Sequence, residues 1–191
     1  MMAMIFVLVL PILTINIISG QQIYPFLGEC PKVEVMKNFN TEKFLGKWYE
    51  QEKYPIFLEM EGKCTTYQYT TNANSTIKVA MHQVSTITKK PNNFEGDIKL
   101  DNKTGEAKLI MGIPSMNIDV PYWVLDTDYK EYAVVWSCIQ EGKFSVRMAS
   151  ILTRDQYPSS EVIEKADEVL ESQNISKTSL KKVDQNNCPA N

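Results

Sequence analysis

Residues 44–50 read FLGKWYE, and they open a run of alternating apolar and polar residues that extends to residue 152. Successive side chains of a strand point to opposite faces, so this alternation predicts strands with one buried face. It is clearest at residues 94–100, FEGDIKL, where Phe94, Ile98 and Leu100 share a face. Turn residues, such as those at 101–105 and 126–128, separate eight such segments, which predicts an all-β sandwich or barrel.

A helix is predicted after the strands, beginning at Ser160. Ser160 suits the N-cap position, and Glu161 and Glu164 suit the positive end of a helix dipole. Apolar residues then recur at helical spacing, namely Val162, Ile163, Ala166, Val169 and Leu170. This apolar stripe is expected to pack against the outside of the sheet.

The bulk composition fits one globular domain. The chain has 191 residues, of which 43% are hydrophobic and 23% charged, and this argues against disorder. The formal net charge is −3, and the longest basic runs are the pairs Lys89-Lys90 and Lys181-Lys182. The composition therefore excludes the basic surface of a nucleic-acid binder.

Residues 1–20 differ from the rest because none of them is charged. Residues 5–13 are apolar apart from Pro11, a stretch shorter than the about 20 residues of a membrane span. We predict a signal peptide at 1–20, cleaved after Gly20, and a single domain at 21–191. A short buried N-terminal strand is the alternative.

Cysteines and glycosylation sequons also favour export. The four cysteines form no CxxC pair, so two disulfides with three possible pairings are expected: Cys30, Cys64, Cys138 and Cys188. Three acceptor sequons begin at Asn74, Asn102 and Asn174. Together these features predict a secreted, extracellular glycoprotein.

Three short motifs occur in a fixed order along the chain. Asn38-Phe39-Asn40 precedes FLGKWYE, TDY stands at 127–129, and ILTR stands at 151–154. In this order the motifs resemble those of the lipocalin family. The segments PYWVL at 121–125 and NCP at 187–189 are similar to the branch that contains apolipoprotein D and the insect Lazarillo-like and bilin-binding proteins.

The resemblance implies an eight-stranded antiparallel up-and-down β-barrel with a C-terminal α-helix packed outside. In that family the motif residues seal one end of the barrel, with the Trp beneath the Arg. Carried over, the structural residues are Gly46, Trp48, Thr127, Asp128, Tyr129 and Arg154. The resemblance also implies the disulfides Cys30–Cys138 and Cys64–Cys188.

The same fold implies a ligand inside the barrel. If Trp48 points inward, parity predicts an inner, ligand-binding set: Tyr67, Tyr69, Met81, Phe94, Ile98, Leu109, Tyr122, Trp136, Val146 and Met148. The alternative is that these residues only fill the barrel; the resemblance favours a cavity. Ser150 stands where relatives in this branch often carry an inward-facing Trp, so a larger or more polar pocket is expected and ligand identity does not carry over.

A loop after the first strand is predicted to lie at the pocket mouth. It reads PIFLEM at residues 55–60, and residues 113–118 are expected nearby. Consecutive apolar residues in a loop need a partner, so Phe57 and Leu58 are predicted to cover the entrance or to contact lipid. Packing of the loop against itself is the alternative.

Catalytic and metal chemistry find little support in the sequence. His82 is the only histidine, and parity places it with Lys78 on the outer face. A thiolate at Cys64 is an alternative nucleophile, but the even cysteine count favours a disulfide. We therefore predict neither an enzyme nor a metal site.

The predicted function is that of a secreted carrier for a fatty acid, sterol or similar lipophile, with no required cofactor. A biliverdin-binding pigment protein and an extracellular protein-interaction factor are the alternatives. The expected partners are the hydrophobic ligand and a lipid surface or receptor at the mouth loops, and nucleic acid is not among them.

Overall fold

The computed structural model describes residues 26–55, 62–71, 76–101 and 105–189. Several sequence-based predictions fall outside these ranges. They are the signal peptide at 1–20, the mouth residues Phe57 and Leu58, and the sequons at Asn74 and Asn102. These stay predictions.

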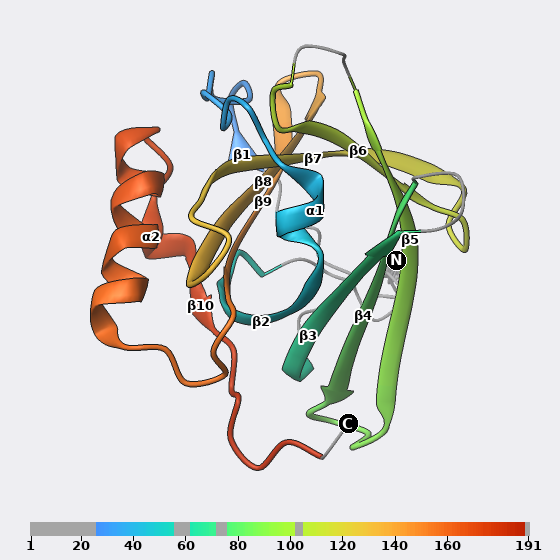
Figure 1. Ribbon diagram of the computed structural model, residues 1–191. Coiled ribbons are helices and arrows are strands. Elements are labelled where there is room, and N and C mark those ends of the chain that lie inside the picture. Colours follow the sequence, from blue (N-terminus) through green and yellow to red (C-terminus); the bar gives the residue numbers. More distant parts are fainter. Residues whose placement is uncertain (1–25, 56–61, 72–75, 102–104, 190–191) are drawn as a thin grey trace, which may run out of the picture.

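Eight antiparallel strands form the closed barrel (Figure 1). Each strand pairs with the next along the chain, and the last pairs back with the first. The strands are β2 (Gly46–Lys53), β3 (Gly62–Thr71), β4 (Ile77–Ser85), β5 (Pro91–Leu100), β6 (Lys108–Ile113), β7 (Ile118–Thr127), β8 (Tyr132–Glu141) and β9 (Phe144–Thr153). The predicted eight-stranded barrel is confirmed, and it closes where β9 pairs with β2.

Two short strands were not predicted. β1 (Phe26–Leu27) pairs with the start of β9, and β10 (Lys181–Lys182) pairs with the end of β2. Strand β3 pairs only with the first half of β2, so the C-terminal segment takes its place beside the second half. Two residues are too few to show a period in the sequence, so only the folded chain reveals these strands.

Helix α2 (Ser160–Ser172) stands outside the barrel and contacts β8 (Figure 1). Val162, Ala166 and Leu170 are its buried residues, in agreement with the predicted stripe. Its N-cap is Ser159, whereas Ser160 is the first helical residue, so the predicted cap was wrong by one position. No helix in the described ranges is long and apolar enough to cross a membrane.

Strand β8 is buried on both of its faces, and this corrects the prediction for Trp136. Val135 lies opposite Ser150, whose hydroxyl donates to Glu50 inside the barrel, so Val135 faces inward. The next residue, Trp136, therefore faces outward. Its ring meets that of Tyr54 at 6.2 Å between centroids, and the Tyr54 hydroxyl donates to the carbonyl of Ser176, just beyond α2.

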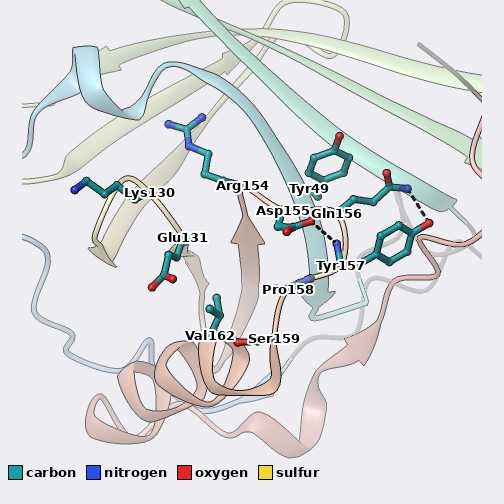
Figure 2. A pocket seen from close by; sticks show the side chains of 10 residues that line it. All are labelled: Tyr49, Lys130, Glu131, Arg154, Asp155, Gln156, Tyr157, Pro158, Ser159 and Val162. Atoms are coloured by element: carbon teal, nitrogen blue, oxygen red, sulfur yellow. Dashed lines mark hydrogen bonds between the residues drawn. The ribbon is translucent and has the colours of Figure 1, made fainter.

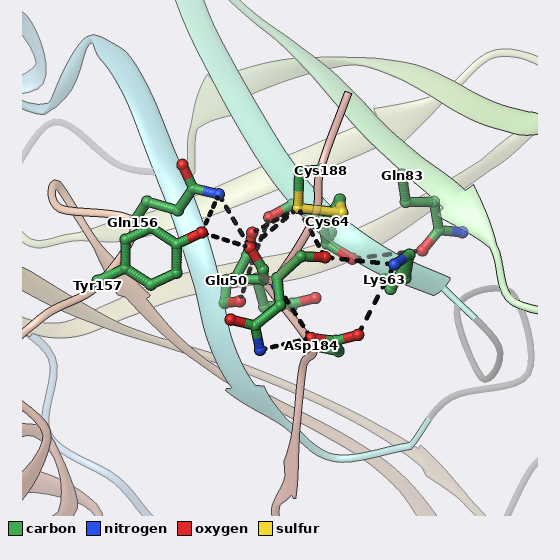
Figure 3. Close-up of a disulfide and its surroundings, with 11 residues drawn as sticks. Glu50, Lys63, Cys64, Gln83, Gln156, Tyr157, Asp184 and Cys188 are labelled. Atoms are coloured by element: carbon green, nitrogen blue, oxygen red, sulfur yellow. Dashed lines mark hydrogen bonds and ion pairs between the residues drawn. A yellow bond between two sulfur atoms is a disulfide. The ribbon is translucent and has the colours of Figure 1, made fainter. Parts of the chain in front are cut away.

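The two disulfides tie irregular segments to the barrel. Cys30 is bonded to Cys138 on β8, and Cys64 on β3 is bonded to Cys188 in the C-terminal segment, which is the pairing that the family resemblance implies. Figure 3 shows Cys64 and Cys188 above Lys63 and Asp184, whose charged groups lie 3.8 Å apart. The disulfide thus holds the C-terminal segment between β2 and β3.

Candidate ligand site in the barrel

Strand pairing identifies the inner face of the barrel. Trp48 lies opposite Tyr67, Tyr67 opposite Met81, and Met81 opposite Phe94, so these side chains share one face across four strands. Nine of the ten residues of the predicted set lie at inner-face positions: Tyr67, Tyr69, Met81, Phe94, Ile98, Leu109, Tyr122, Val146 and Met148. Trp136 is the exception described above.

The end of the barrel beside α1 (Thr41–Phe44) is sealed around Trp48 and Arg154. The guanidinium carbon of Arg154 lies 3.8 Å from the Trp48 ring centroid. Arg154 also donates hydrogen bonds to the carbonyls of Lys43, Lys47 and Tyr129 at 2.9, 2.9 and 3.1 Å. One side chain therefore joins α1, β2 and the turn after β7, as expected for a structural role.

Gly46 permits this close approach. Its φ of +98° lies in the region that L side chains rarely adopt. A Cβ atom at this position would also lie 3.1 Å from Arg154 Nη1. The backbone conformation therefore favours glycine at this position of the first motif, and a Cβ atom there would crowd the Arg154 guanidinium.

The TDY turn is held by its own side chains. Thr127 Oγ1 accepts from the Tyr129 N–H at 2.9 Å and donates to the Tyr132 carbonyl at 2.6 Å. Asp128 Oδ1 accepts from the backbone N–H groups of residues 130–132. Although partial burial acts to raise the pKa of Asp128, these N–H groups and Lys165 hold it below its ordinary value. These hydrogen bonds fix the conformation of the turn, so its side chains have a structural role here.

Aromatic side chains fill the barrel next to this seal. The Phe44 ring lies 5.3 Å from that of Trp48 and 5.0 Å from that of Tyr69. The hydroxyls of Tyr69 and Tyr122 are hydrogen-bonded to each other. Tyr69 is 1% exposed and Trp48 0%, so these two rings offer almost no surface to a ligand.

The inner face becomes accessible toward the other end. Val146, Met148 and Ser150 on β9 are only partly buried, and so are Phe94 on β5 and Met111 on β6. These side chains stand at inner-face positions, so a ligand that enters the barrel would contact them. This accessible half of the interior is the candidate ligand site.

A polar cluster lies within this interior, and the sequence analysis missed it. Lys53 Nζ lies 3.0 Å from Glu50 Oε2, while Glu50 Oε1 accepts from the Tyr67 hydroxyl at 3.2 Å and from the Ser150 hydroxyl at 2.8 Å. Glu50 follows Trp48 by two positions, so parity alone could have placed it inside. Lys53 faces inward only because of a β-bulge between Glu50 and Glu52, which no sequence pattern signals.

A groove lies outside the barrel, beside the start of α2 (Figure 2). Its volume is ≈ 770 Å³, and Tyr49, Arg154 and Tyr157 contribute to its lining. Within the groove, Asp155 and Gln156 form hydrogen bonds with Tyr157. Arg154 also stacks on Trp48 at the sealed end of the barrel. The groove is open and polar, and it is separate from the predicted inner face.

The residues weighed for catalysis lie away from the interior. His82 is exposed on the outer face, opposite Thr66, and its Nδ1 lies 3.2 Å from Asn93 Oδ1. All four cysteines are in disulfides. Among the described residues, no group of three or more His, Cys, Asp or Glu side chains is arranged to hold a metal ion.

Comparison with known proteins agrees with this architecture. A model of the lipocalin / cytosolic fatty-acid binding protein family matches residues 45–187. Apolipoprotein D from Oryctolagus cuniculus is 36% identical over 191 residues, 98% of this chain and 99% of its own. Apolipoprotein D from Macaca fascicularis is 37% identical over 164 residues, 85% of this chain and 86% of its own. The solved structure of insecticyanin from the tobacco hornworm Manduca sexta has a TM-score of 0.73 at 27% identity and covers 84% of this chain and 88% of its own. The chain belongs to the lipocalin family.

Proposed function

We propose that this lipocalin is a secreted carrier that holds a small hydrophobic molecule in the accessible half of its barrel. The observation that carries the proposal is the partial exposure of apolar side chains on the inner face, above all Val146, Met148, Phe94 and Met111. A carrier needs apolar surface that is exposed to water in the unliganded protein and is buried when the ligand binds. Membership of the lipocalin family supports the same function.

Binding rather than catalysis fits the placement of the reactive side chains. A catalytic base or nucleophile must reach the bound molecule. His82 lies on the outer face, and Cys64 is bonded to Cys188. The proposal is therefore a binding protein without an enzymatic step.

Secretion is supported by the cysteines. Disulfides persist in oxidising compartments, and this chain has two that join distant segments. We include the predicted signal peptide at 1–20 and a glycan at Asn174 in the proposal. Asn174 is exposed beyond the end of α2, so a glycan there would extend into solvent. Mass spectrometry of the secreted protein, before and after enzymatic deglycosylation, tests both.

The ligand class is tested by titration of the purified protein with fatty acids, sterols and biliverdin. Saturable binding of a lipophile at one site per barrel supports the carrier. A bound blue-green chromophore, or a clear preference for biliverdin, replaces it with the pigment alternative. If none of these molecules binds, the carrier function is wrong and the protein-interaction alternative is favoured.

A matched pair of variants locates the site. Met148→Trp adds volume to the accessible interior and should abolish binding, because the indole would occupy the ligand's space. Glu95→Trp places the same side chain at an exposed outer-face position beside Phe94 and should leave binding unchanged. Equal affinities in the two variants would exclude the barrel interior as the ligand site.

The mouth residues Phe57 and Leu58 remain a prediction. If they cover the entrance, a Phe57→Ser, Leu58→Ser variant should take up and release ligand faster. Unchanged ligand kinetics and unchanged binding to lipid vesicles would remove this role.

A further inference from the structure

A buried hydroxyl on the inner wall of the barrel has no hydrogen-bond partner within the described part of the chain. Ser137 in β8 is 5% exposed, and its Oγ makes no hydrogen bond to any described residue. Burial of a polar group without a partner is unfavourable, because the group gives up its hydrogen bonds to water and gains none. Buried hydroxyls in proteins are nearly always paired, so the exception at Ser137 needs an explanation.

Ser137 faces the barrel interior. It lies opposite Met148, which stands on the inner face of β9. The next residue, Cys138, is bonded to Cys30 in the irregular segment before α1, as expected because successive side chains of a strand point to opposite faces. The Ser137 hydroxyl thus belongs to the wall of the candidate ligand site.

The inner-face neighbours of Ser137 on β8 and β9 are apolar. Val135 precedes it and Ile139 follows it on the same face of β8, and Val146 lies opposite Ile139. These side chains and that of Met148 offer no oxygen or nitrogen atom. Ile139, Val146 and Met148 are partly exposed, so a ligand that covers them lies beside the Ser137 side chain.

We infer that Ser137 is a hydrogen-bonding residue of the ligand site, and that the ligand carries a neutral oxygen, a carbonyl or a hydroxyl group, within an apolar body. The Ser137 hydroxyl donates to a ligand carbonyl, or forms a hydrogen bond in either direction with a ligand hydroxyl. No covalent bond forms or breaks. This inference rests on the proposed carrier function and specifies the chemistry of its ligand.

The place of Ser137 along β8 sets the place of the oxygen in the ligand. The strand from Ser137 to its end at Glu141 spans about 13 Å at about 3.3 Å per residue, so the contact lies away from the rim. Val135 lies deeper and Ile139 nearer the rim, so apolar groups of the ligand flank its oxygen on both sides. A neutral oxygen needs only one hydrogen bond here, whereas a charged group in this apolar stretch would need further partners.

The Ser137 hydroxyl is covered in the unliganded barrel, so the contact includes a local rearrangement. A serine side chain has three staggered positions about χ1. Met148, which lies opposite, has an unbranched side chain with three rotatable bonds. Rotation of either side chain can expose the hydroxyl to the interior, and such rotamer changes are common when a partner binds.

The test uses octadecanoate and a set of keto-octadecanoates that differ only in the position of one carbonyl group. The isomers have the same length, charge and polarity, so differences between their dissociation constants report the position of the carbonyl. We expect the isomer with a keto group in the middle of the chain to bind about three- to tenfold more tightly than the isomer with the group near the methyl end, the usual gain from one hydrogen bond.

Three variants locate the effect at the hydroxyl. Ser137→Ala should remove the preference among the isomers and leave octadecanoate binding unchanged, whereas Ser137→Thr keeps a hydroxyl and should keep the preference. Ser145→Ala makes the same change on the outer face of β9, where the hydroxyl accepts from Arg147 at 3.0 Å, and should also keep it. Circular dichroism establishes that each variant is folded.

Two further measurements separate ligand contact from a structural role. The unliganded Ser137→Ala variant should unfold at a urea concentration no lower than the natural protein, because its hydroxyl has no partner to lose. The infrared stretch of the bound keto group, identified by an isotopic label on its carbon, should lie at lower frequency in the natural protein than in Ser137→Ala, because a hydrogen bond weakens the carbonyl bond.

The outcomes distinguish this inference from the carrier function. If octadecanoate binds and all keto isomers bind equally well, the Ser137 contact is wrong and the carrier stands. A preference that persists in folded Ser137→Ala, or a clearly lower urea midpoint of that variant, also overturns the contact. If no compound of the set binds, both proposals fail. If Ser137→Ala does not fold, the infrared band decides: a frequency equal to that of the ketone in a hydrocarbon solvent overturns the contact.

Discussion

The two halves of the barrel interior are built from the same strands but packed differently. Beside α1, Trp48, Tyr69 and Ile98 are at most 2% exposed, and the Arg154 guanidinium lies over the Trp48 ring. Farther along the same strands, Met148 and Phe94 remain partly exposed, and the polar groups of Glu50 and Lys53 pair inside.

This difference separates stability from binding. The sealed half gains its free energy from complete burial and from hydrogen bonds that join three sequence motifs. The accessible half leaves part of its apolar surface for a ligand. Changes in the first half should therefore mainly alter the free energy of unfolding, and changes in the second mainly ligand affinity.

The largest expected effect is the removal of the sealing ring. Trp48→Ala should lower the free energy of unfolding by about 3–5 kcal/mol, because the side chain is fully buried and leaves a cavity. Met148→Ala should cost less than about 2 kcal/mol, because that side chain is already partly exposed. Urea unfolding measures the free energy of unfolding of both variants. Equal losses would contradict the difference between the two halves.

The buried ion pair should be the exception in the accessible half. Lys53→Met leaves the Glu50 carboxylate without its ammonium partner and should cost about 3 kcal/mol. The double variant Glu50→Gln, Lys53→Met removes both charges and should recover most of that loss. If the double variant is no more stable than Lys53→Met, the lost stability does not come from the unpaired charge of Glu50.

Two arginines that lie over aromatic rings test the seal: Arg154 belongs to it, whereas Arg147 stands on the outer face of β9. Arg154→Lys should cost about 2 kcal/mol, because an ammonium cannot hold three carbonyls and stack on Trp48 together. Arg147 also lies over a ring, that of Phe26 at 4.9 Å, but far from the seal. Arg147→Lys should cost less than about 1 kcal/mol in the same urea assay. The reverse order would contradict the role of Arg154.

Asp128 should make the sealed half sensitive to acid. Backbone N–H groups lower its pKa in the folded state, so its contribution is present above the unfolded pKa and is lost as pH falls through the folded pKa. Asp128→Asn should cost about 1 kcal/mol near neutral pH, as for the loss of a helix cap. The difference from the natural protein should shrink on acidification, and a difference constant with pH would exclude this cause.

Substitution of Asp167 should change the free energy of unfolding least, and in the opposite direction to substitution of Asp128. Burial is the main cause that raises the pKa of Asp167, and burial together with Asp167 raises that of Glu52. A raised pKa favours the folded state below the unfolded pKa, and this advantage is lost as pH rises through the folded pKa. Asp167→Asn should therefore be neutral or stabilising near neutral pH, by less than about 0.5 kcal/mol. Thermal unfolding at several pH values measures it, and clear destabilisation would contradict it.

Side-chain period predicted most of the barrel, and it failed where both faces of a strand are buried. Residues 133–137 are all buried, because α2 covers the outer face of β8. A large apolar residue such as Trp136 fits either face, so hydrophobicity could not choose between them. The continuous apolar run AVVW at 133–136 is the signal of a strand buried on both sides.

Local sequence determined the strands, the order of the three motifs and the stripe of α2, because these depend on residues a few positions apart. Parity from Trp48 also assigned nine of ten inner-face residues and could have assigned Glu50. Tertiary structure alone decided the inward turn of Lys53 at the bulge, the place of β10 beside β2, and the division of the interior into a sealed and an accessible half. These features depend on which distant strands meet, and no short-range pattern contains that information.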